Sequence, residues 1–108
     1  MVWLAAEGKG NGKGLVGGGT EFPYMHSASD DDRWCQFVEC PDALNSSRTD
    51  SQSRSGVIFK PTVGNAVFWE NFRADQTGTG YEETFHAGLP VLEGVKIGLN
   101  IWSWGRIF

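Results

Sequence analysis

Residues 95–102 have the sequence VKIGLNIW, in which polar or small residues alternate with aliphatic ones. Successive side chains of a β-strand point to opposite faces, so the alternation divides this run into two kinds of surface. One face carries Lys96, Gly98, Asn100 and Trp102, and the other carries Val95, Ile97, Leu99 and Ile101. This pattern predicts a strand in a barrel or sandwich, with one face toward a ligand cavity and the other packed under a second layer.

The rest of the chain is also predicted to be mainly β. Among its 108 residues are 15 glycines, which separate short apolar runs that are too brief for most helices. We expect strands at residues 1–6, 20–23, 56–61 and 66–69, and we expect the last of these to be buried. The predicted fold is a partial double-stranded β-helix, or jelly roll, of antiparallel strands in a single domain covering residues 1–108.

A long polar excursion at about residues 24–55 interrupts this pattern and is predicted to be an irregular insertion. The apolar sequence WCQFV at residues 34–38 predicts an anchored patch in its middle, and the Ser-, Arg- and Asp-rich residues 45–55 are typical of a lid or of a disordered segment. Cys35 and Cys40 lie five residues apart, a spacing that suits either a small disulfide or two free thiols.

Charge and hydropathy narrow the classes of partner. The net charge of −4 and the pI near 5.0 disfavour binding to nucleic acid, which depends on clustered Lys and Arg. No stretch approaches the roughly 20 consecutive apolar residues that a membrane helix requires, and the first residues lack the basic leader of a secretory signal. We therefore expect neither nucleic acid nor a membrane span.

The residues best suited to chemistry are His86 and Lys96. They lie on either side of Gly88-Leu89-Pro90, which is expected to turn the chain so that the two side chains face one cavity from an antiparallel pair. A neutral imidazole can bind a metal ion, and an ammonium group can hold a carboxylate. The other interpretation is an ordinary core histidine and a solvent-exposed lysine.

Several motifs together resemble the prolyl 4-hydroxylase family of 2-oxoglutarate- and Fe(II)-dependent dioxygenases. The family pattern P-x-x-G-x-A-x-x-F, then H-x-G-x-P-V, G-x-K and a tryptophan, is similar to KPTVGNAVFW at residues 60–69, HAGLPV at 86–91, GVK at 94–96 and Trp102. Upstream, GGTEFP at residues 18–23 resembles the family's G-G-x-T-x-F-P strand. The likeness covers nearly the whole chain outside the insertion.

The resemblance implies a site and an activity. His86 would be a ligand of Fe(II), Lys96 would bind the distal carboxylate of 2-oxoglutarate, Thr20 would donate a hydrogen bond to it, and Trp102 would form a wall of the pocket. The implied reaction is hydroxylation of a proline residue in a peptide or protein, with ascorbate as a further cofactor. Relatives of this type often work in the endoplasmic reticulum.

The family's H-x-D pair, which supplies two of its three iron ligands, is not found. By its place in the pattern it should precede residue 1, so we expect a single incomplete dioxygenase domain that is inactive alone, as a fragment or a degenerate relative. An uncovered sheet edge and apolar face would then favour self-association. The alternative function is a non-catalytic, jelly-roll or cupin-like fragment that binds a ligand.

Overall fold

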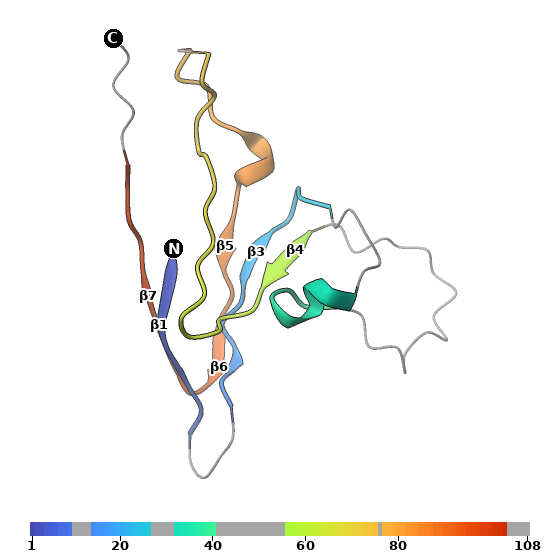
Figure 1. The fold of residues 1–108 in the computed structure, drawn as a ribbon, viewed down its shortest axis with the longest axis vertical. Helices are drawn as coiled ribbons and strands as arrows, with labels where there is room; N and C mark the ends of the chain where they lie inside the picture. The colour runs from blue at the N-terminus through green and yellow to red at the C-terminus, as the bar shows by residue number, and fades with distance from the viewer. Residues whose placement is uncertain (10–13, 27–31, 41–55, 76, 104–108) are drawn as a thin grey trace, which may run out of the picture.

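The computed structural model describes residues 1–9, 14–26, 32–40, 56–75 and 77–103, and these form a mainly β structure of antiparallel strands (Figure 1). The strands are β1 (Val2–Glu7), β2 (Val16–Gly17), β3 (Thr20–Phe22), β4 (Val57–Phe59), β5 (Ala87–Gly88), β6 (Val91–Glu93) and β7 (Val95–Leu99). The 3-10 helices are η1 (Asp32–Gln36) and η3 (Glu82–Thr84). The expectation of a mainly β fold is confirmed.

Strands β5, β6 and β7 follow one another along a single interrupted path. This path pairs first with β3, then with β2 and finally with β1, always antiparallel. Leu89 N–H donates to the Gly19 carbonyl at 2.8 Å, and Gly18 N–H donates to the Pro90 carbonyl at 2.9 Å, so the pairing continues between β5 and β6. The predicted reversal at Gly88-Leu89-Pro90 is therefore wrong, because these residues hydrogen-bond across to β3 instead of turning the chain.

The ribbon changes direction at Gly94, between β6 and β7. Gly94 has φ +106°, and a Cβ atom at this position would collide with the Glu7 carbonyl oxygen at the end of β1. Only glycine suits both constraints. In Figure 1 the path descends through β5 and β6, turns, and returns as β7 beside β1, which gives the ribbon two arms.

Each arm gains a further neighbour. In the arm containing β3, strand β4 pairs with the free side of β3, with Thr20 opposite Phe59. In the other arm, Met1 and Val67 exchange two backbone hydrogen bonds of 2.8 and 2.9 Å, and Val2 forms an isolated bridge with Ala66.

Residues 66–69 were predicted to form a buried strand, and that prediction is wrong. The segment makes an isolated bridge at Ala66 and no regular strand, and Phe68 is 85% exposed. The reason is that β1 offers hydrogen bonds to residues 64–67 only, so no ladder continues to Trp69.

The anchored patch in the polar excursion is confirmed. The segment that follows η1 lies beside β4: Glu39 N–H donates to the Ile58 carbonyl, and Lys60 N–H donates to the Phe37 carbonyl. Cys35 and Cys40 form a disulfide, which decides between the two states that their spacing allowed. The predicted lid or disordered segment at residues 45–55 lies outside the described residues.

Few of the described side chains are fully buried. Trp3 and Phe22 are the buried hydrophobic residues and Thr20 is a buried polar one. The aliphatic face of residues 95–101 was expected to pack under a second layer, and this is wrong, since Val95, Ile97, Leu99 and Ile101 are 45–72% exposed. On the other side of β7, Lys96 contacts Gly18 in the arm that contains β3. No helix in the described part of the chain is long and apolar enough to cross a membrane.

Candidate functional site

The candidate site is built along one face of the β3 arm. Thr20 and Phe22 alternate in β3, so their side chains lie on the same side, about 6.7 Å apart, and Gly18 lies just before the strand with φ +74°. All three are buried, and Thr20 and Phe22 have no exposed surface. We call this row of three positions the inner row.

His86 lies at the Phe22 end of the inner row. Its ring stacks on Phe22, with centroids 5.2 Å apart and planes 27° apart, and meets the edge of the Trp69 ring at 4.6 Å. Phe59 and Trp69 also pack edge-on against Phe22, so the imidazole is held by an aromatic cluster.

A backbone hydrogen bond fixes which nitrogen of His86 is available. The Nδ1 atom lies 2.8 Å from the Thr84 carbonyl oxygen. A carbonyl oxygen only accepts, so the contact assigns the proton to Nδ1 and leaves the lone pair on Nε2. Metal-binding histidines are commonly oriented in this way, which makes Nε2 the atom suited to a metal ion.

Lys96 lies at the Gly18 end of the inner row. Its Nζ atom donates to the Gly18 carbonyl oxygen at 2.5 Å, and the side chain is half-buried. In the described part of the chain no carboxylate forms an ion pair with this ammonium group. An ammonium group has three donors, so Lys96 keeps capacity for an anionic partner.

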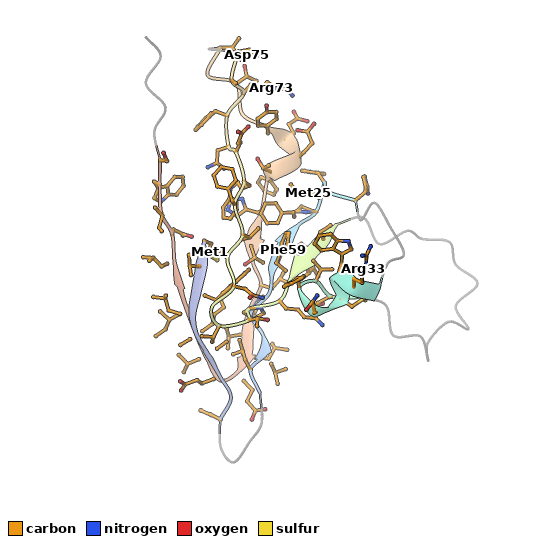
Figure 2. The ribbon with its side chains drawn as sticks, in the orientation of Figure 1. Met1, Met25, Arg33, Phe59, Arg73 and Asp75 are labelled. Carbon is orange, nitrogen blue, oxygen red and sulfur yellow. A yellow bond between two sulfur atoms is a disulfide. The ribbon has the colours of Figure 1, made fainter. Side chains whose placement is uncertain are left out.

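Thr20 occupies the position between these two ends. Its hydroxyl group lies 3.9 Å from the sulfur of Met1, and that sulfur also lies above Gly98, where a Cβ atom would approach it to 3.5 Å. Met1 therefore reaches from the β1–β7 arm toward the inner row, and Figure 2 shows it beside β1, to the left of Phe59. Methionine is flexible, so this side chain can adapt to a neighbour.

The structure thus brings three of the four residues singled out from the sequence to one row: His86, Thr20 and Lys96. Trp102 lies beyond the end of β7 and is 67% exposed, so it is not part of this row.

A surface hollow of about 930 Å³ adjoins the His86 end of the row. Its lining includes the rings of Tyr24, Tyr81 and Phe85 and the side chains of Glu82 and Glu83. This hollow was not predicted from the sequence. The run EETFH at residues 82–86 places acids and a ring beside the histidine, but nothing in the sequence shows that Tyr24 joins them.

The potential metal ligands among the described residues do not form a complete metal site. Among the residues with described positions, no three His, Cys, Asp or Glu side chains gather where they could hold a metal ion. His86 fits as one iron ligand, but a single imidazole binds Fe(II) weakly, because affinity depends on several ligands held together.

Comparison of this chain with protein-family models, with curated proteins and with solved structures finds no match.

Proposed function

We propose that this chain provides the cosubstrate-binding wall of a 2-oxoglutarate- and Fe(II)-dependent dioxygenase of the prolyl 4-hydroxylase type. The inner row carries the proposal: a cation and a metal-competent imidazole stand at its two ends, with a buried hydroxyl group between them. The folded ribbon is the kind of path from which a jelly roll is built, and we include that fold in the proposal.

In this proposal each residue binds or orients. Lys96 holds the distal carboxylate of 2-oxoglutarate through its free ammonium donors, and Thr20 donates to the same carboxylate after its hydroxyl turns from the Met1 sulfur. His86 presents Nε2 to Fe(II), because the Thr84 carbonyl keeps the proton on Nδ1. Iron, 2-oxoglutarate and oxygen, when bound together, would supply the hydroxylation of an unactivated C–H bond.

The remaining parts of the proposal follow from the resemblance. The substrate is a proline residue of a peptide or protein, ascorbate is a further cofactor, and Trp102 approaches the pocket in the complete site. Two more iron ligands are required beside His86. Self-association through the open edge of the sheet and work in the endoplasmic reticulum belong to the same proposal.

The chain offers a matched pair of lysines for a test. Lys96 and Lys60 are both half-buried, and each donates its ammonium group to a backbone carbonyl at 2.5 Å, Lys96 to Gly18 and Lys60 to Cys35. We expect Lys96→Met to weaken binding of 2-oxoglutarate about tenfold and Lys60→Met to leave it unchanged, as measured by ligand-observed NMR. Equal affinities of the two variants would refute the proposal.

Iron binding is tested with the two histidines. Under nitrogen, His86→Ala is expected to abolish the effect of Fe(II) on 2-oxoglutarate affinity, whereas the exposed His26 can be changed to Ala without effect. Formation of succinate with Fe(II), ascorbate and a proline-containing peptide is the readout of complete catalysis. An iron effect that survives in His86→Ala excludes this histidine as a ligand.

A second candidate is a non-catalytic, cupin-like binding fragment. It is favoured by the lack of a three-residue ligand group in the described part of the chain. This function predicts that small acids or sugars bind equally well with and without Fe(II), and that His86→Ala has no effect on their affinity. The same titrations therefore decide between the two candidates.

A further inference from the structure

The hollow beside His86 has an aromatic wall made by residues distant in sequence. Tyr24 follows β3 and Phe85 follows η3, yet their ring centroids lie 6.0 Å apart with planes tilted by 43°. Both rings remain mostly exposed, at 59% and 62%. Paired aromatic rings that stay exposed offer a large contact surface to a ligand at a low cost in side-chain entropy.

The backbone of this wall is held in place before any ligand binds. Tyr81 N–H donates to the Asn71 carbonyl at 2.9 Å, and the Thr84 hydroxyl donates to the Glu70 carbonyl at 2.9 Å. Phe85 N–H closes η3 by donating to the Glu82 carbonyl at 3.0 Å. A preformed wall loses little conformational entropy on binding, which favours affinity.

The charge of the hollow is negative. Glu82 and Glu83 are both exposed on η3, and none of the described residues that line the hollow is Lys or Arg. The guanidinium of Arg73 lies 5.0 Å from the centroid of the Tyr81 ring, at the edge of the hollow, and Figure 2 shows Arg73 close to Asp75. An aromatic wall with two carboxylates suits a positively charged side chain.

We propose that this hollow binds an extended peptide segment through a Lys or Arg side chain. The aliphatic stem lies along Tyr24 and Phe85, and the charged end faces Glu82 and Glu83. The volume of about 930 Å³ accommodates more than one residue, so neighbouring peptide residues reach His86 at the inner end. The inference rests on the proposed function in one respect, because it treats this peptide as the substrate of that function. It narrows the substrate class to peptide segments that carry a basic residue near the residue that reacts.

The test compares two short peptides that differ at one position, with Lys in one and the uncharged isostere norleucine in the other. Fluorescence anisotropy is measured at low salt without iron or 2-oxoglutarate. We expect about fivefold tighter binding of the Lys peptide, since one cation–π contact and two exposed ion pairs each contribute modestly. In a Glu82→Gln, Glu83→Gln double variant the preference is expected to fall to near one.

The matched control is Glu7→Gln, which removes an exposed carboxylate at the end of β1, away from the hollow, and is expected to keep the preference. Phe85→Leu is a second variant that leaves both charges in place and is expected to weaken binding of both peptides. Equal affinity of the two peptides for the unchanged chain, or a preference that survives in the double variant, overturns the inference.

Failure of this inference is distinguishable from failure of the proposed function, because the peptide assay contains neither iron nor 2-oxoglutarate. A Lys preference that depends on Glu82 and Glu83 supports the hollow even where Lys96→Met and Lys60→Met bind 2-oxoglutarate alike. Loss of the preference with 2-oxoglutarate binding still dependent on Lys96 overturns the hollow alone.

Discussion

Replacing Phe22 with leucine removes the ring on which the candidate site is assembled while keeping an apolar side chain at a fully buried position. The Phe22 ring contacts Phe59, Trp69 and His86, with centroid distances of 5.2–5.6 Å. An aromatic pair contributes about 0.5–1.5 kcal/mol beyond the area it buries. Leucine retains part of the burial, so we expect Phe22→Leu to lower the free energy of unfolding by about 2 kcal/mol.

That loss corresponds to a fall in Tm of roughly 10 °C for a chain of this size. The assay is urea unfolding followed by tryptophan fluorescence, because Trp69 packs against Phe22 and reports on the cluster. The matched control is Phe68→Leu, since Phe68 is 85% exposed and its replacement should cost less than about 0.5 kcal/mol. If Phe22→Leu destabilises the chain no more than Phe68→Leu, Phe22 is not at the centre of the core.

Three further predictions concern other parts of the chain. Reduction of the disulfide beside η1 is expected to lower the free energy of unfolding by about 2 kcal/mol, as measured by thermal unfolding with and without dithiothreitol, and an unchanged Tm would contradict this. Gly94→Ala should destabilise the chain by about 1–3 kcal/mol more than Gly64→Ala. Both glycines have a positive φ, but of the two only Gly94 faces a carbonyl oxygen, and equal losses of stability in urea unfolding would contradict this reasoning. Hydrogen bonds from Thr77 lower the pKa of Asp75 below 3.8, so this carboxylate stabilises the fold above its unfolded pKa and loses that effect as the pH falls through its folded pKa. Thr77→Val should raise the pKa of Asp75 toward 3.8 in an NMR titration, and an unchanged pKa would show that the shift has another cause.

Local patterns predicted individual strands better than they predicted pairing. The alternation in residues 95–102 correctly gave β7, and the run ending at Pro23 gave β3. Gly88-Leu89-Pro90 has the composition of a turn, but the backbone groups of Gly18 and Gly19 hydrogen-bond to it across the ribbon. Turn composition describes what a segment can do locally, and long-range hydrogen bonds decided otherwise.

The same distinction applies to the candidate site. His86 and Lys96 were selected by residue type and spacing, which the sequence displays directly. The tautomer of His86 depends on the position of the Thr84 carbonyl, and the hollow depends on Tyr24 meeting Phe85. The sequence carries no signal for such meetings because they arise from the fold of the whole chain.

The disulfide shows a different limit of sequence analysis. Cys35 and Cys40 have a spacing that is compatible with a bond or with free thiols, and the path of the chain from η1 to Cys40 brings them together. Spacing alone could not decide, because short loops between cysteines occur in both states.

Strands β1, β2 and β3 all pair with one continuous segment, residues 87–99, and this has a consequence for protein engineering. Residues 87–99 hold β1 and β2–β3 in register through the hydrogen bonds of the strand pairs. This alignment does not depend on the peptide linkage between Glu7 and Val16. That linkage can therefore be lengthened, replaced by a reporter sequence or cut, and the two arms should keep their register. New chain ends placed there would leave the row that joins Lys96 to His86 intact.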